Sequence, residues 1–273
     1  MSNEEQNKYW NDKAGPKWVE NQEKMDAMLA PVTDRLLAAA KVNAGDHVLD
    51  VGCGTGQTSQ LIAEQGALVT GIDLSETMLD VARSHGTPGC AFVTADASTF
   101  KGEQQFDRAT SRFGVMFFDD PVGAFENLHE NIRHGGKMVF ACWREPKLNP
   151  WAIVPAMAVK PFLEEGPAPD PLAPGPFAFA QQERLQGILK DSGFSDVTLE
   201  SFDFEMTLSD GRGAAEATDF ACKIGPGSRA MEELQGEQIQ YARDAISDAF
   251  QPYVAPNGKV SLGASIWIVS ATA

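Results

Sequence analysis

Glycine occupies every second position of one short loop, at Gly52, Gly54 and Gly56, shortly after a strand expected at residues 47–49. Glycine is needed where the backbone takes a positive φ or where a ligand comes close to the main chain. Because a helix is expected to follow, the strand, the loop and the helix N-terminus together form a seat for a nucleotide-like ligand. The dinucleotide-binding pattern G-x-G-x-x-G fits poorly, since positions 57 and 59 hold glutamine and serine. Taken alone, the loop could also be a tight turn without a ligand.

An acidic residue stands at the end of each of the next two expected strands. The second strand, expected at residues 67–72, ends at Asp73, and the third ends at Asp96. A carboxylate at the tip of the second strand can accept hydrogen bonds from both ribose hydroxyls of an adenosine. Ser75 suits the N-cap of the helix that follows, which would place Met78 within reach of the same ligand.

Strands and helices alternate between residues 47 and 142. Further strands are expected at 90–95, 106–111 and 138–142, and helices at 31–42, 57–65, 76–85 and 121–133. Pro121 suits the first turn of the last of these helices, and Gly135 suits its end. Because each crossover helix returns the chain to the same edge, the alternation predicts an α/β fold with a parallel sheet.

These motifs, in this order and spacing, resemble the class I S-adenosylmethionine (SAM) methyltransferases of the small-molecule type (methyltransferase type 11). The resemblance covers roughly residues 43–145. It implies a Rossmann-like, seven-stranded, mostly parallel sheet with an antiparallel last strand, SAM as cofactor, and an Asp96 that contacts the adenine amine. The cofactor-binding residues that the resemblance implies are Asp50, Gly52, Gly54, Thr55, Gly56, Asp73, Leu74, Met78, Asp96, Ala97 and Arg112.

The remainder of the chain is expected to complete the sheet and to cover it. A helix over residues 180–192, a strand over 196–204 and a last strand over 265–269 are expected, with a stiff proline-rich loop at 166–176. We expect a SAM-binding core over residues 31–205 with 259–273, an N-terminal lid over 1–30, and insertions at 144–180 and 206–258 that contribute to a helical substrate cap. The second insertion contains two helical stretches around residues 225–227 and is expected to lie over the carboxyl edge of the sheet.

Aromatic side chains at loop positions are candidates for walls of a substrate pocket. These are Trp10, Trp18, Phe113, Phe117, Trp143 and Trp151. The alternative is that they pack the cap onto the core, and for Trp267, inside a strand, core packing is expected.

Methyl transfer from SAM depends on holding the acceptor in line and excluding water, and it needs a base only when the acceptor must lose a proton. None of the four histidines is expected at the carboxyl edge of the sheet. Tyr9 and Asp119 remain candidate bases, although Asp119 or its neighbour Asp120 could equally cap the helix at Pro121. Arg112, expected beside the reaction centre, could pair with an anionic acceptor or the cofactor carboxylate, or form a salt bridge to Asp119 or to an acid of the cap.

Composition and charge limit which substrates and partners are expected. The chain has 273 residues and a net charge of −16, which disfavours nucleic acid as a substrate. We expect a monomeric or homodimeric protein without membrane spans, because no apolar stretch is long enough and the N-terminus is polar. The four cysteines show no C-x-x-C spacing, so neither a metal site nor a disulfide framework is expected, and a cytoplasmic setting fits.

Two other functions stay open at this point. One is a nicotinamide-dependent oxidoreductase on a related sheet, against which the glycine spacing and the antiparallel last strand count. The other is a SAM-binding protein without catalysis, which the missing base leaves open. The methyl acceptor is not identified, and oxygen, nitrogen, sulfur and carbon acceptors are all compatible with the sequence.

Overall fold

The computed structural model describes residues 3–164, 166 and 170–273, so part of the expected proline-rich loop lies outside the described residues. The chain forms two compact units. Unit 1 comprises Met1–Trp143, Pro171–Phe202 and Ile266–Ala273, and unit 2 comprises Arg144–Asp170 and Asp203–Ser265. In the described part, no helix has both the length and the apolar character needed to span a bilayer.

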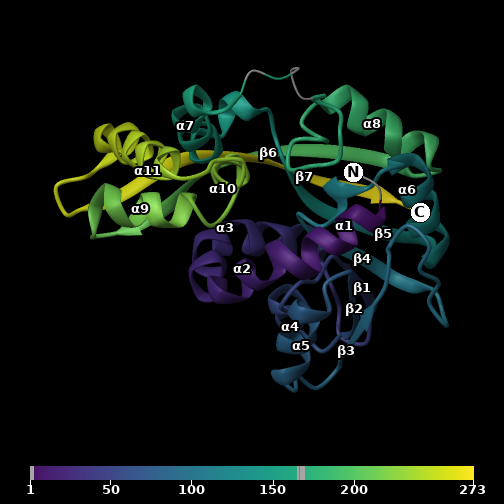
Figure 1. Cartoon of the computed structure of the whole chain (residues 1–273). Coiled ribbons are helices and arrows are strands. Elements are labelled where there is room, and N and C mark those ends of the chain that lie inside the picture. Colours follow the sequence, from purple (N-terminus) through teal and green to yellow (C-terminus); the bar gives the residue numbers. More distant parts are fainter. Residues whose placement is uncertain (1–2, 165, 167–169) are drawn as a thin grey trace. The chain divides into compact units, whose positions relative to one another are not determined.

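Seven strands form one sheet in the order β3-β2-β1-β4-β5-β7-β6 (Figure 1). Their bounds are β1 His47–Val51, β2 Leu68–Asp73, β3 Cys90–Thr94, β4 Phe106–Arg112, β5 Ile132–Trp143, β6 Ser195–Asp210 and β7 Lys259–Thr272. β1 to β5 run parallel, and β7 pairs with β5 in the antiparallel direction, with Trp143 opposite Ile266. The predicted fold class, a mostly parallel sheet with an antiparallel last strand, is confirmed.

The sheet is covered by helices on both faces, so the central strand β1 is buried along most of its length. In β1, Val48 and Leu49 are fully buried. In Figure 1, α4 and α5 lie on one side of the central strands and α6 and α8 on the other. The helices of unit 1 that follow β1 are α4 Gln57–Ala63, α5 Glu76–Ser84, the 3-10 turn η2 Val115–Phe117, α6 Pro121–Asn131 and α8 Gln182–Asp191.

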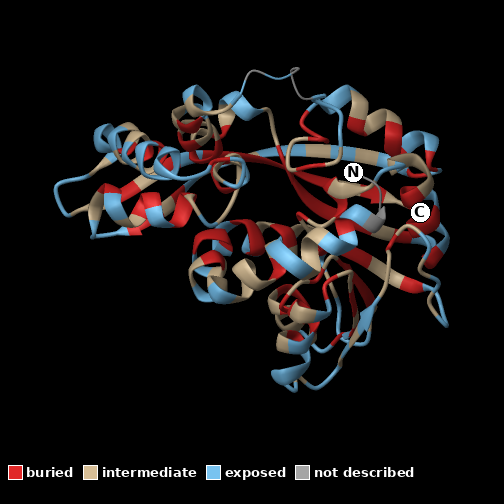
Figure 2. Cartoon of the chain, in the orientation of Figure 1, coloured by how far each residue is buried: buried red, intermediate tan, exposed pale blue. Residues whose placement is uncertain are grey.

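The N-terminal region is helical throughout its described residues. It comprises α1 Asn3–Tyr9, the π-helix η1 Trp10–Ala14, α2 Gly15–Glu20 and α3 Gln22–Ala40. The helix expected at 31–42 therefore begins nine residues earlier, and Pro31 lies inside it. A buried stripe at helical spacing, Met25, Met28, Leu29, Val32 and Leu36, outweighs the hydrogen bond that proline removes. Figure 2 shows this buried stripe along α3.

The junction between α6 and β5 differs from the expectation. α6 ends at Asn131, and β5 begins at once with Ile132, so Gly135 lies inside the strand and does not end the helix. Gly135 has a φ of +77° and stands where the pairing with β4 shifts register. Its N–H donates to the carbonyl of Ala273 at 2.6 Å, which ties this irregular stretch to the end of β7.

Unit 2 combines the first expected insertion as far as Asp170 and the whole of the second with the outer parts of β6 and β7, while residues 171–180 belong to unit 1. Its helices are α7 Pro150–Val159, α9 Gly213–Ala221, α10 Pro226–Met231 and α11 Glu237–Phe250, with short 3-10 turns η3 Pro146–Leu148, η4 Lys160–Phe162 and η5 Gln251–Tyr253. Three helices therefore follow residue 210, where two were expected, and β6 and β7 extend beyond their predicted ends. The expected position of this unit over the carboxyl edge stays a prediction.

Candidate functional site

The glycine loop follows β1 and leads into α4, as predicted. Gly52, Gly54 and Gly56 have φ values of +65°, +56° and +86°, a region that favours glycine. At Gly54 an added Cβ would find only the sulfur of Met78 nearby, at 3.7 Å. Gly54 is thus the loop position with unoccupied space beside its Cα, and the side chain of Met78 borders that space.

The other two glycines serve the packing of the loop. An added Cβ at Gly52 would lie 2.7 Å from the Cα of Gly114, and one at Gly56 would lie 2.9 Å from the Cβ of Ala82. Real Cβ atoms avoid such distances, so these two positions need glycine for space as well as for φ. Thr55, between them, is buried.

Asp73, at the end of β2, joins the glycine loop to the turn before α5. Its carboxylate accepts the N–H of Gly54 at 2.8 Å and the N–H of Ser75 at 2.9 Å. Burial raises the pKa of Asp73, and the backbone hydrogen bonds oppose that shift. The hydroxyl of Ser75 in turn accepts from the N–H of Met78 at 3.4 Å, the predicted N-cap. Asp73 therefore holds the loop after β1 and the turn before α5 together.

An open pocket of about 700 Å³ lies beside the ends of β2 and β3. Its lining residues are Glu5, Asn7, Lys8, Leu74, Thr94, Ala95 and Asp96. One oxygen of Asp96 accepts both the N–H and the hydroxyl of Ser98, at 2.8 and 2.7 Å, which fixes the turn after β3. Ala97 is buried, and its carbonyl accepts from the side chain of Asn127. Leu74 and Asp96, both predicted cofactor-binding residues, thus line one pocket.

Asp50 is buried inside unit 1, with 1% of its surface exposed. Its carboxylate accepts the hydroxyl of Ser59 at 2.6 Å and that of Thr110 at 3.3 Å, which ties α4 to β1 and β4. Burial raises its pKa to about 6. The structure therefore gives this predicted cofactor residue a role beneath the loop, and any effect on a ligand would pass through the loop.

Arg112, at the end of β4, lies in a buried polar cluster. Its guanidinium donates to Thr33 at 2.8 Å and to the amide oxygen of Gln57, and it forms an ion pair with Asp26 at 3.2 Å. Of the predicted alternatives, the structure shows a salt bridge to Asp26, an acid of the expected N-terminal lid, while Asp119 is exposed and is not the partner of Arg112. Burial raises the pKa of Asp26 and lowers that of Arg112.

Four of the five aromatic candidates in unit 1 form two pairs. Trp10 meets Phe117 edge-on with ring centroids 5.3 Å apart, and Tyr9 meets Trp10 at 5.9 Å. Phe113 stacks on Trp143 at 4.3 Å with an interplanar angle of 6°. Phe113 also has a φ of +68°, a strained conformation for a bulky residue that often accompanies functional sites.

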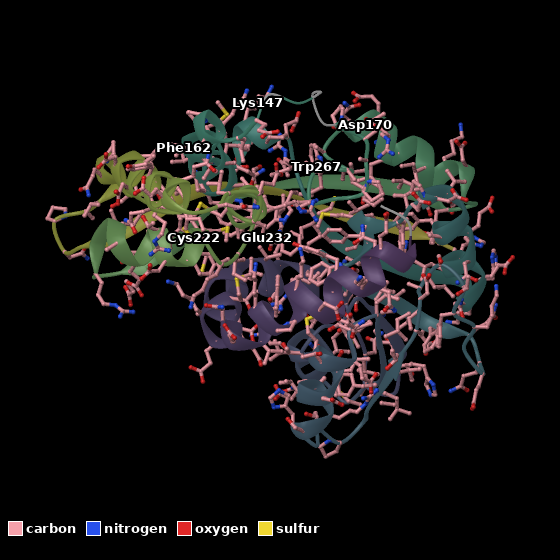
Figure 3. The ribbon with its side chains drawn as sticks, in the orientation of Figure 1. Lys147, Phe162, Asp170, Cys222, Glu232 and Trp267 are labelled. Atoms are coloured by element: carbon pink, nitrogen blue, oxygen red, sulfur yellow. The ribbon has the colours of Figure 1, made fainter. Side chains whose placement is uncertain are left out.

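Trp151 and Trp18, two further candidates for the pocket wall, take part in neither ring pair. Trp151 belongs to the core of unit 2, where it is 8% exposed, contacts Gly225 and donates from its indole to Asn149 at 3.1 Å. Trp18 is half-buried in α2. Trp267 on β7 is buried, as expected, and donates to the carbonyl of Ala180 at 3.2 Å (Figure 3).

The histidines lie away from the glycine loop and Asp73. His47 begins β1 and bonds Gln104 at 2.6 Å, and His129 packs edge-on against Phe194 from within α6. His85 follows α5, and His134 lies in the first part of β5. Asp120 caps α6 by accepting the N–H of Gly123 at 3.1 Å, which accounts for one of the paired aspartates.

Three polar residues near this edge were not predicted from the sequence. Asn11 bonds the turn before α5, Gln6 is buried on α1, and Gln57 contacts Arg112. Gln57 stands next to the glycine motif and could have been considered on that ground. Nothing in the sequence marks Gln6 or Asn11, because their positions depend on how the N-terminal helices fold back.

Comparison with known proteins finds a similar sequence family and several relatives. Residues 48–136 match the sequence family described as a methyltransferase domain. The chain is 33% identical to the ubiquinone biosynthesis O-methyltransferase of Coxiella burnetii (strain Dugway 5J108-111), over 51% of this chain and 62% of that relative. The YcgJ protein of Bacillus subtilis has a TM-score of 0.58 at 15% identity, covering 88% of this chain and 97% of its own.

A second solved structure carries a ligand. It is phosphoethanolamine N-methyltransferase 2 of Haemonchus contortus in complex with phosphomonomethylethanolamine and S-adenosylhomocysteine, with a TM-score of 0.53 at 18% identity over 89% of this chain and 52% of that one. At such identities a likeness shows the fold alone. The chain spans less than two thirds of the curated relative it matches. Over residues 48–136, this chain is therefore similar to a methyltransferase domain.

Proposed function

We propose that the protein is a SAM-dependent methyltransferase that acts on a small molecule. The observation that carries this proposal is the hydrogen bond between the N–H of Gly54 and the carboxylate of Asp73, which joins the loop after β1 to the end of β2. An S-adenosyl ligand needs both parts at once, a loop without side chains and an acceptor for the ribose hydroxyls. The room beside Gly54 fits such a ligand.

The residues present would act by binding and orientation. SAM, when bound, supplies an activated methyl group on a sulfonium. Asp73 would hold the ribose, Leu74 and Asp96 the adenine, and the loop around Gly54 the amino-acid end. Since no histidine of this chain lies at the carboxyl edge, we assign no general base and attribute the rate mainly to positioning and exclusion of water.

The acceptor is proposed to be a small molecule with an oxygen nucleophile. The curated relatives are named O-methyltransferases, which favours oxygen. The net charge of −16 disfavours nucleic acid, and the ring pairs formed by Trp10 with Phe117 and by Phe113 with Trp143 favour an acceptor with an apolar or aromatic body. A monomeric or homodimeric cytoplasmic enzyme remains our expectation.

The cofactor role of Asp73 is tested by calorimetric titration with S-adenosylhomocysteine. Asp73→Ala removes charged hydrogen bonds worth about 1.5–3 kcal/mol each, so affinity should fall at least about tenfold. Asp73→Asn, which keeps one acceptor oxygen, should show a smaller loss. Asp80→Asn, an exposed carboxylate on α5 that pairs with Arg83, is the matched control and should bind normally.

Two results would count against the proposal. Equal affinity of wild type and folded Asp73→Ala would remove the assigned role of this residue. Tight binding of NAD in place of S-adenosylhomocysteine would favour the oxidoreductase alternative. A panel of phenolic acceptors incubated with SAM then separates an enzyme from a SAM-binding protein, because only an enzyme releases S-adenosylhomocysteine in proportion to methylated product.

A further inference from the structure

The N-terminal segment, defined here as residues 3–20, is fastened to the turn that follows Asp73. The side-chain amide of Asn11 donates to the carbonyl of Leu74 at 2.9 Å and accepts the N–H of Glu76 at 3.0 Å. Next to it, the hydroxyl of Ser75 donates to the carbonyl of Trp10 at 3.1 Å. The three consecutive residues 74–76 are thus hydrogen-bonded to two consecutive residues of the segment, Trp10 and Asn11.

The backbone of the segment is shaped for this contact. Residues 10–14 form a π-helix, a rare conformation that recurs at functional sites. Gly15 follows directly, and a Cβ there would lie 2.3 Å from the carbonyl oxygen of Trp10 and 2.6 Å from the hydroxyl of Ser75. Only glycine at this position permits the close approach, so the docked position is specific.

Gln6, on α1 of the same segment, is buried with 2% of its surface exposed. Neither its amide nitrogen nor its amide oxygen has a hydrogen-bond partner within the described residues. Buried polar side chains have partners in the large majority of cases, and an exception calls for a ligand or water that completes the site. The amide can donate and accept at once, which suits a ligand group that also does both.

The position of Gln6 along α1 separates it from the open pocket beside β2 and β3. Glu5, Asn7 and Lys8 line that pocket, whereas Gln6 does not. Gln6 precedes Trp10 by four residues, a spacing that places both on one side of a helix. The ring of Trp10 contacts Phe117, which follows β4. Gln6 therefore shares a side of the segment with Trp10 and lies outside the lining of the open pocket.

We propose that Gln6 is a cofactor-binding residue, whose amide makes its two hydrogen bonds to a polar group of the S-adenosyl ligand once the segment is fastened by Asn11. The inference rests on the proposed function. A cofactor is the favoured occupant because the fastening contacts of Trp10 and Asn11 go to residues 74–76, directly after Asp73. The side-chain amide then has a partner only in the ligand-bound state.

The test uses Gln6→Met, which keeps the length of the side chain and removes its polar atoms. Thermal unfolding without ligand and calorimetric affinities for S-adenosylhomocysteine and 5′-methylthioadenosine are measured, the latter lacking the amino-acid tail. Without ligand, Tm should be unchanged or higher, since an unpartnered buried amide is removed. Affinity for S-adenosylhomocysteine should fall about tenfold. Gln65→Met, whose amide bonds locally to Leu61, is the matched control and should change neither quantity.

The second ligand locates the contact. If affinity for 5′-methylthioadenosine is retained in Gln6→Met, the amide contacts the amino-acid tail, and if it falls equally, the amide contacts the adenosine. Unchanged affinity for both ligands would overturn the proposal, as would a lower ligand-free Tm with unchanged affinity, which would show a structural amide. Gln6→Ala repeats the titrations should the methionine variant misfold.

The fastening is tested separately with Asn11→Asp. The new carboxylate cannot donate to the carbonyl of Leu74, so the segment should release. Trypsin should then cut after Lys8 or Lys13 about tenfold faster than in wild type in saturating S-adenosylhomocysteine. Asn21→Asp, whose side chain bonds locally to Lys17, is the control. Equal cleavage of Asn11→Asp and wild type would overturn the fastening. Failure of the wild-type protein to bind S-adenosylhomocysteine would instead contradict the proposed function, before any variant is compared.

Discussion

At the scale of single residues, Asp50 links the fold to pH. Its pKa is raised from 3.8 to about 6, mainly by burial, so the folded state holds a proton that the unfolded state releases. The contribution of the protonated Asp50 to the free energy of unfolding is therefore fully present below about pH 4 and is lost as the pH rises from about 4 to about 6. A pKa difference of this size corresponds to about 3 kcal/mol at most.

Asp50→Asn should remove this dependence, because an amide does not titrate. The free energy of urea unfolding of wild type, relative to Asp50→Asn, should be lower at pH 7 than at pH 4 by up to about 3 kcal/mol. The exposed Asp80→Asn serves as reference. A constant difference between wild type and Asp50→Asn across this range would contradict the raised pKa.

Arg112 is another interior charged residue, and its partners in the structure are protein groups. Because Asp26, Gln57 and Thr33 accept from its guanidinium, Arg112→Met should mainly destabilise the fold, by about 3 kcal/mol, through the buried carboxylate left without its cation. The double variant Asp26→Leu with Arg112→Met should recover much of the loss in thermal unfolding. If Arg112→Met keeps its stability and loses affinity for S-adenosylhomocysteine, the arginine binds the cofactor carboxylate, as the sequence alone also allowed.

At the scale of elements, the glycines of one loop do different work. Gly54→Ala meets a positive φ but open space, so the protein should fold, while affinity for S-adenosylhomocysteine should fall at least about tenfold because the methyl group occupies ligand space. Gly56→Ala adds contacts of 2.9 Å to Ala82 and 3.0 Å to Phe92, so its main effect should be a lower Tm. Titration and thermal unfolding of both variants separate the two effects. Parallel losses in both would show that the loop acts as one packed unit without a ligand side.

At the scale of the whole molecule, the proposed cofactor contacts all belong to unit 1, whereas Trp151 lies in the core of unit 2. Trp151→Ala should cost about 3–5 kcal/mol in the unfolding of unit 2. Affinity for S-adenosylhomocysteine should stay within about threefold of wild type. A tenfold loss of affinity in a variant with an intact circular dichroism spectrum would show that unit 2 takes part in cofactor binding.

The sequence by itself determined the local elements around the proposed cofactor site. Local patterns set the strand, glycine loop and helix around Gly54, the acid at Asp73 and the N-cap at Ser75. They also set the order of the strands along the chain, since backbone conformation, helix capping and apolar runs act over a few residues. The placement of the histidines followed from the same strand order.

Tertiary structure decided the contacts between distant segments. The partner of Arg112 is Asp26, 86 positions away, and the partner of Asn11 is the turn at residues 74–76. Neither pairing has a local signal, because it depends on how the N-terminal helices fold back onto the sheet. The start of α3 before Pro31 and the position of Gly135 inside β5 likewise reflect burial and strand pairing, which outweighed the local preferences of proline and glycine.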